Sequence, residues 1–422
     1  MPKVRRSRWK KILRVAGPGF ITGASDDDPS GILTYTQTGA AFGLTQLWTV
    51  VLALPFMIVM QEMCGRIGMV TGKGIADVIR RHYGRGMLLW AVALLFTANT
   101  VNIGSDLGAM ASSAQLIFGL PFWGWLTLMA VATLLLEIFI PYPTYARYLK
   151  WLTLSLFAYL IVVFMVVDDW GAALRAAVTP TFSWDRAFLM NIVAVFGTTI
   201  SPYLFFWQAD EEVEEEVEHH KLKAMGVGKP SIHPRDIRDM RLDTGIGMGF
   251  SNMISFFIIL TGASTLGRAG ITTIGTAADA AAALAPLGGT FAEILFAAGI
   301  IGTGLLAVPV LAGSASYAVA ESLHWKEGLS KAWWQAKGFY GVIVASTIIG
   351  MLLNAAGIAP FRMLYYTAVL NGIVSPFLMM FVLLIANSGK IMGAYRNGWT
   401  SNALGWLITA FMGGCAVMVV MG

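Results

Sequence analysis

Apolar runs of about twenty residues or more, separated by short polar connections, recur along the whole chain. A helix needs about 20 predominantly apolar residues to cross the hydrocarbon core of a bilayer. The pattern predicts an all-α integral membrane protein, a single transmembrane domain over residues 1–422. Eleven membrane-spanning helices are expected, over residues 15–42, 45–65, 87–115, 121–142, 151–167, 187–208, 244–267, 291–321, 338–357, 363–387 and 399–421.

The composition excludes the other broad classes of protein. Apolar residues make up 56% of the chain and charged residues 13%, about half the charged share of a soluble domain. The two cysteines lie far apart in the sequence and indicate neither a disulfide framework nor a zinc site. We therefore expect a lipid bilayer around the protein, with no nucleic-acid partner, no obligate protein partner and no cofactor.

Basic residues predict the orientation of the spans. With the N-terminus in the cytoplasm, 25 of the 29 Lys and Arg residues fall on the cytoplasmic side. Such an excess is typical of cytoplasmic loops. We expect the protein to lie in a bacterial inner membrane, with a cytoplasmic N-terminus that carries no cleaved signal peptide and with an external C-terminus. Residues 209–243 form a cytoplasmic loop in this topology, and its acidic run, 210–216, is expected to be a solvated extension of the sixth span.

The first span contains a cluster of charges near its middle, where residues 26–31 read Asp-Asp-Asp-Pro-Ser-Gly. One Asp at the centre of a membrane helix costs about 2.5–3.5 kcal/mol even on the mildest scale. Pro29 removes a backbone donor and Gly31 loosens the chain, so the helix is expected to break here. Asp28 is then expected to cap the second half-helix, and the same carboxylate has an oxygen to spare for a ligand.

The sixth span has a second interruption, where residues 197–203 read Gly-Thr-Thr-Ile-Ser-Pro-Tyr. One proline alone is usually a kink. Two interruptions in matching spans, however, indicate a transporter with two inverted repeats and a site at the midplane. The repeats are expected over residues 15–167 and 187–387, with 399–421 as an extra span.

Oxygen ligands at the two breaks predict a cation site. Carboxylates and freed carbonyls favour hard divalent ions such as magnesium, calcium or manganese, and neither break contains Lys or Arg. Asn99, Asn102 and Asp106 share one face of the third span, which either makes interhelical hydrogen bonds or lines the cavity beside the ion's water. Asn371 in the tenth span is a weaker candidate. Asp26 and Asp27 either attract cations or bond to nearby backbone.

Several motifs resemble those of the natural resistance-associated macrophage protein family of divalent metal transporters, which has the fold of the bacterial leucine transporter. They are Gly17-Pro18-Gly19-Phe20, Val70-Thr71-Gly72-Lys73-Gly74, Ala283-Leu284-Ala285-Pro286-Leu287-Gly288 and Met392-Gly393. The family's Asp-Pro-Gly-Asn motif falls on residues 28–31 and its Met-Pro-His motif on 201–203. The resemblance thus implies a metal site at Asp28, Gly31, Thr198 and Ser201.

Two of these four positions depart from the family pattern, because Gly31 replaces an Asn and Ser201 replaces a Met. Losing the soft thioether weakens the preference for transition metals. A wider, oxygen-rich site suits magnesium, which keeps several of its waters. The pattern is similar to the branch of NRAMP-related magnesium transporters.

The positions that the family associates with proton movement are also altered, to Val101, Tyr203 and Gln208. None of these side chains carries a proton near neutral pH. The expected function is uptake of partly hydrated magnesium, and of manganese, by alternating access without proton coupling. A proton-coupled manganese or iron transporter is the alternative, and an organic-substrate symporter is disfavoured by the three adjacent carboxylates. No nucleophile motif or metalloprotease motif points to an enzyme.

Overall fold

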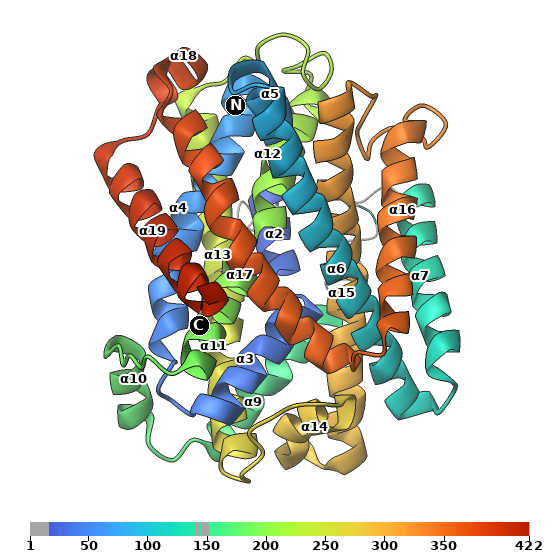
Figure 1. Cartoon of the computed structure of the whole chain (residues 1–422), viewed down its shortest axis with the longest axis vertical. Coiled ribbons are helices and arrows are strands. Elements are labelled where there is room, and N and C mark those ends of the chain that lie inside the picture. Colours follow the sequence, from blue (N-terminus) through green and yellow to red (C-terminus); the bar gives the residue numbers. More distant parts are fainter. Residues whose placement is uncertain (1–16, 141–143, 145–151, 422) are drawn as a thin grey trace, which may run out of the picture.

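A computed structural model of the chain describes residues 17–140, 144 and 152–421, and these contain helices but no β-strand (Figure 1). Nine helical segments of this described part are long and apolar enough to cross a membrane. Eight of them contain the helices α4 (Trp48–Thr71), α6 (Arg85–Phe118), α7 (Phe122–Phe139), α13 (Pro234–Gly262), α15 (Gly289–Leu323), α16 (Lys337–Leu353), α17 (Pro360–Asn387) and α19 (Trp399–Met421). The ninth consists of α11 (Arg186–Thr199) and α12 (Pro202–Glu218).

The remaining two predicted spans are built from shorter helices. The first is divided into α2 (Pro18–Asp26) and α3 (Pro29–Phe42). The fifth contains a 3₁₀ turn (Leu152–Leu156) and α9 (Phe157–Val166), while residue 151 lies outside the described residues. Short helices connect the spans: α5 (Ile75–His82), α10 (Trp170–Val178), α14 (Ala277–Ala281) and α18 (Gly389–Met392).

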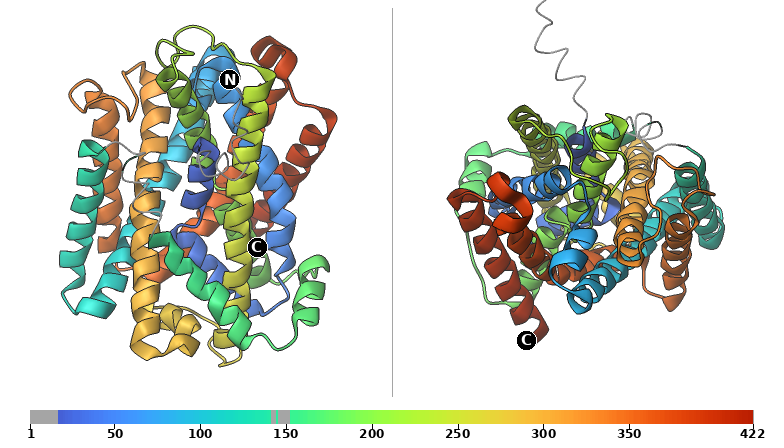
Figure 2. Two further views of the ribbon diagram at one scale, coloured as in Figure 1. Left: turned by 180° about the vertical axis from the view of Figure 1, so that it is seen from behind. Right: turned by 90° about the horizontal axis from the view of Figure 1, so that it is seen from above.

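The interrupted helices lie inside the bundle. Figures 1 and 2 show α7 and α16 at one outer side and α19 at the other, with α2, α11 and α12 between them. Glycine permits the closest helix contacts in this interior, as is common between membrane helices. A Cβ on Gly23 of α2 would lie 2.3 Å from the backbone of Gly247 in α13, and one on Gly197 of α11 would lie 2.3 Å from the amide nitrogen of Gly372 in α17.

The acidic run after the sixth span is helical but less solvated than the sequence predicted. α12 continues to Glu218 and α13 begins at Pro234, so only residues 219–233 form the connection between them. Asp210 is 0% exposed, and Glu212 and Glu216 are each 3% exposed. The expectation of a solvated extension is therefore wrong for these three carboxylates, because the end of α12 packs against α4 and α15.

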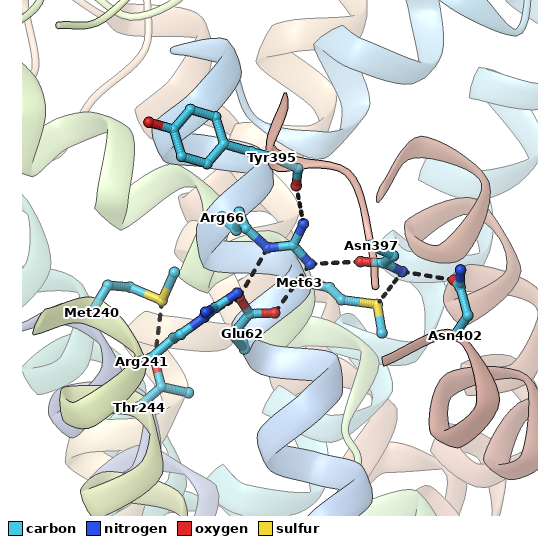
Figure 3. Close-up of polar contacts among 9 residues, drawn as sticks. All are labelled: Glu62, Met63, Arg66, Met240, Arg241, Thr244, Tyr395, Asn397 and Asn402. Carbon is cyan, nitrogen blue, oxygen red and sulfur yellow. Dashed lines mark hydrogen bonds and ion pairs between the residues drawn. The ribbon is translucent and has the colours of Figure 1, made fainter. Parts of the chain in front are cut away.

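A buried ion-pair network ties α4 to the first turns of α13 and to the segment before α19 (Figure 3). The Arg66 guanidinium donates to both carboxylate oxygens of Glu62, at 2.9 and 3.1 Å. It also donates to the Asn397 side-chain oxygen at 2.5 Å and to the Tyr395 carbonyl. Arg241 of α13 approaches Glu62 from the other side, at 2.8 Å. The Glu62–Arg66 pair therefore joins three segments that are distant in the sequence, with Glu62 bound to α13 and Arg66 to the segment before α19.

Candidate functional site

The break in the first span lies at Asp27 and Asp28, as predicted. α2 ends at Asp26, and Asp27 and Asp28 leave the helical conformation with ψ angles of 56° and 170°. Pro29 starts α3 because its missing N–H costs nothing at the first helical position. The last carbonyl groups of α2 and the first amides of α3 are therefore free to bind other groups in the protein interior.

The Asp28 carboxylate is held by three donors. Its Oδ1 accepts from the Gly31 amide at 2.7 Å and from the Ser30 hydroxyl at 2.8 Å. Its Oδ2 accepts from Asn102 Nδ2 of α6 at 3.0 Å. A carboxylate has about four lone-pair positions, so these three bonds fix its orientation and leave one position for a further ligand. Asp28 thus combines the predicted helix cap with a spare acceptor.

The break in the sixth span lies at Ile200 and Ser201, between α11 and α12. Ser201 is extended, with a ψ of 132°, and Pro202 starts α12. The Ser201 hydroxyl does not cap α12; it donates to the Thr198 carbonyl at 2.6 Å and to the Gly197 carbonyl at 3.1 Å. The Thr198 carbonyl, which the resemblance implies as a ligand, therefore already accepts one hydrogen bond and keeps a second lone pair.

The two breaks face each other. Tyr203 of α12 donates its hydroxyl proton to the Ser25 carbonyl, at 3.0 Å, in the last turn of α2. On the other side of the break, the hydroxyls of Tyr35 in α3 and Thr199 in α11 lie 2.8 Å apart. Hydrogen bonds thus link both half-helices of the first span to the sixth span.

Oxygen atoms from both breaks converge beside Gly31. The position that a Cβ of this residue would take lies 3.1 Å from Thr198 Oγ1, 3.3 Å from Asp28 Oδ1 and 3.4 Å from the Asp26 carbonyl oxygen. Asp28, Thr198 and Ser201 are each about 1% exposed. Three of the four residues implied by the resemblance, Asp28, Gly31 and Thr198, therefore lie together in a buried, oxygen-rich place, which we call the break site, and Ser201 is joined to it by its hydrogen bond to the Thr198 carbonyl.

The side chains on the polar face of α6 differ in role: one makes an interhelical hydrogen bond, and the others lie at or near the break site. Asn99 makes an interhelical hydrogen bond to the Leu311 carbonyl of α15, at 2.9 Å. Asn102 binds Asp28 directly. Asp106 follows Asn102 by one helical turn and is 0% exposed, and neither of its carboxylate oxygens has a hydrogen-bond partner. An unpaired buried carboxylate is costly, and a cation held between Asp28 and Asp106 would offset that cost.

The other candidates lie around the break site. Asn371 of α17 is 1% exposed, with its Nδ2 unpaired. Gln208 donates to Glu212 at 2.8 Å, one turn along α12. Asp26 and Asp27 both accept from the Ser251 hydroxyl of α13, at 2.7 and 3.1 Å, so these carboxylates are partnered by a side chain and not by nearby backbone.

Sequence reasoning missed three polar groups at the site, two of them on residues that it had named for a different atom. The Asp26 carbonyl and the Thr198 hydroxyl reach the space beside Gly31, although the sequence suggested only the Asp26 carboxylate and the Thr198 carbonyl. Ser375 of α17 donates to the Ile200 carbonyl at 2.9 Å and thereby provides a hydrogen-bond donor for a carbonyl at the second break. Ser375 lies one helical turn after Asn371, and that spacing was the only sequence signal for it.

Comparisons with known proteins identify the family of the chain. Residues 19–422 match the sequence profile described as natural resistance-associated macrophage protein-like. The chain is 25% identical to a Ralstonia nicotianae protein named divalent metal cation transporter MntH, over 95% of this chain and 89% of that protein. A Mycobacterium tuberculosis protein of the same name is 24% identical, over 98% and 93% of the two chains.

A solved structure has the same fold. The crystal structure of the Eremococcus coleocola manganese transporter, in complex with an aromatic bis-isothiourea substituted compound, superposes with a TM-score of 0.75. It is 17% identical in sequence, and the match covers 99% of this chain and 88% of that one. The predicted fold class, an all-α membrane protein of the leucine-transporter type with interrupted first and sixth spans, is confirmed.

Proposed function

Because the chain belongs to the natural resistance-associated macrophage protein-like family, we propose that it carries divalent cations across a membrane by alternating access through the break site. One observation supports this most strongly. Asp28 is a buried carboxylate bonded to Asn102 of α6, and Asp106, a second buried carboxylate, follows Asn102 one turn later on the same face of that helix; neither break contains Lys or Arg. Such a site attracts positive charge and repels anions.

We further propose magnesium as the main ion, with manganese also accepted. The ligands at the site are oxygen atoms: the spare position of Asp28, the Thr198 oxygens and the Asp26 carbonyl. No soft sulfur stands at position 201 to favour a transition metal. Gly31 brings no side-chain ligand to these oxygens, so we propose that waters kept by the ion fill that coordination position. Asp106 and Asn102 are then positioned to bind those waters.

Transport in this proposal needs no proton. Tyr203 and Gln208 occupy the positions implied by the resemblance to move protons, and both are engaged in hydrogen bonds with the Ser25 carbonyl and Glu212. The membrane potential is a sufficient driving force, because a divalent ion gains about 4.6 kcal/mol per 100 mV. That energy corresponds to more than roughly a thousandfold accumulation. The distribution of basic residues supports an inner-membrane protein with a cytoplasmic N-terminus and an external C-terminus.

Proteoliposomes containing a pH-sensitive dye test the proposed coupling. We expect magnesium or manganese uptake, driven by an imposed negative potential, to proceed without acidification of the lumen. Acidification that requires both the metal and the protein would instead support the second candidate, a proton-coupled manganese transporter. The relative from Eremococcus coleocola is named a manganese transporter, which favours manganese as the ion of that candidate.

Restoring the two altered ligand positions is expected to change the ion preference. In the double variant Ser201→Met and Gly31→Asn, a thioether and an amide oxygen reach the break site, and we expect preference for manganese over magnesium to rise about tenfold, or about 1.4 kcal/mol. The Cβ added at Gly31 would lie 3.1 Å from Thr198 Oγ1, so that side chain must shift slightly. Competition between the two ions, measured by titration calorimetry, gives the ratio.

The matched control replaces Ser201 with Leu and also carries Gly31→Asn. Leu is close to Met in size but has no sulfur. An equal change in the two double variants would mean that size, and not the thioether, sets the preference. An unchanged ratio in both would place ion selectivity elsewhere in the protein.

A further inference from the structure

A second acidic place lies between the end of α12 and the start of α13, beside the first residues of α2. It is a cavity of about 200 Å³ that reaches Gly17 and Pro18. Six carboxylates line it, and we call it the vestibule: Glu212, Glu215, Glu216, Asp236, Asp239 and Asp243. Lys221 is the one Lys or Arg among its lining residues.

Five of the six carboxylates have partners that account for their position. Glu212 accepts from Gln208, at 2.8 Å. Asp243 accepts from the Gly17 and Phe20 amides at 3.3 and 3.1 Å, which fixes the start of α2. The other three are Asp236 with Lys221 at 3.2 Å, Asp239 with Arg235 at 3.6 Å and Glu215 with His219 at 3.8 Å.

Glu216 is the exception. It is 3% exposed, neither of its carboxylate oxygens has a hydrogen-bond partner, and its side chain lines the vestibule. A buried carboxylate without a donor is costly unless a positive charge or a proton comes to it. The vestibule therefore has a carboxylate that its own protein groups leave unsatisfied, in a cavity where acidic residues outnumber basic ones.

We propose that the vestibule binds a hydrated divalent cation, as a second ion site on the path between the break site and the cytoplasm. The inference rests on the proposed function. No three acidic, His or Cys side chains among the described residues are arranged to ligate a metal ion directly, so the ion keeps its water shell and is bound through it. A cavity of about 200 Å³ has room for an ion together with several of its waters.

The location of the vestibule suits a role in ion release from the break site. The vestibule touches the first residues of α2, and the break site lies at the other end of that helix. α2 has nine residues, so the two places are separated by roughly 13 Å at 1.5 Å per residue. An ion leaving Asp28 along α2 reaches the six carboxylates before it reaches bulk water. Magnesium favours this route in particular, because it dehydrates reluctantly and so is easily held through its waters.

Manganese titration of the purified full-length protein, followed by the electron paramagnetic resonance signal of free Mn²⁺, tests the proposal. We expect wild-type protein to bind two ions. The Asp28→Asn variant is expected to keep one, with the affinity of the vestibule. The Glu216→Gln variant is expected to keep the ion at the break site and to bind the second at least about tenfold more weakly. Repeating the titration calorimetrically with Mg²⁺ extends the result to the proposed cargo.

Glu218→Gln is the matched control, since Glu218 is exposed on the same helix and does not line the cavity. It is expected to bind both ions as wild type does. Asp28→Asn protein that binds no manganese would overturn the vestibule site while leaving the proposed function intact. If Asp28→Asn protein instead transports normally, the proposed function fails, whatever the vestibule binds. An equal loss of affinity for the second ion in Glu216→Gln and Glu218→Gln would show that the loss comes from general surface charge, and it would also overturn the proposal.

Discussion

The Asp28→Asn variant is expected to lose divalent-cation uptake almost completely while remaining folded. Asparagine is as good a helix cap as aspartate, so the bonds from the Ser30 hydroxyl and the Gly31 amide keep an acceptor. The negative charge, however, is gone. Removing one partner of a buried charge pair costs about 3–5 kcal/mol, which corresponds to ion binding that is weaker by roughly two to three and a half orders of magnitude. Uptake of manganese and magnesium into proteoliposomes measures the loss.

Ser30→Ala is the control for Asp28→Asn. It removes one of the three donors to the carboxylate but keeps the charge. One hydrogen bond to a charged group contributes about 1.5–3 kcal/mol. Because the Gly31 and Asn102 donors remain, we expect ion affinity to fall by about tenfold, and by no more than about a hundredfold. Uptake by Asp28→Asn protein at half the wild-type rate or more would remove this carboxylate from the transport mechanism.

Arg66→Ala is expected to cause the largest loss of stability among the substitutions considered. Its guanidinium is 3% exposed and binds Glu62 and two groups before α19 (Figure 3). Breaking a buried ion pair costs about 3–5 kcal/mol. Because Arg241 still pairs with Glu62 in the variant, we expect the lower end of that range, about 3 kcal/mol. Thermal unfolding in one detergent, followed by intrinsic fluorescence, gives the change in Tm.

Arg241→Ala provides the comparison, since its side chain is bound to the same Glu62 oxygen but is 55% exposed. Exposed ion pairs contribute about 0–1 kcal/mol, so its Tm is expected to fall much less. Similar decreases for Arg66→Ala and Arg241→Ala would mean that burial of the Arg66 pair adds nothing. Heating rates must be matched, because membrane proteins often unfold irreversibly and Tm then depends on the scan rate.

The break in the first span was predictable because its cause is local. Three carboxylates followed by a proline are incompatible with continuous helix in a membrane, and Asp28 caps α3 as expected. The burial of Asp210, Glu212 and Glu216 was not predictable in the same way. A run of acidic residues at the end of a span is predicted to be solvated when only its sequence neighbours are considered. The packing of α12 against α4 and α15 buries these three carboxylates, and that packing is not visible in the local sequence.

The sequence by itself determined the all-helical membrane architecture, the two interruptions and the absence of sulfur and positive charge from both, because hydrophobicity, proline and residue identity act within one helix. The tertiary structure decided which polar groups meet. It brought Asn102 of α6 and Thr198 of α11 to Asp28, turned Asp26 and Asp27 toward Ser251 of α13, and left Asp106 and Glu216 without partners. Contacts between helices far apart in the chain depend on their packing, and no spacing along the sequence records them.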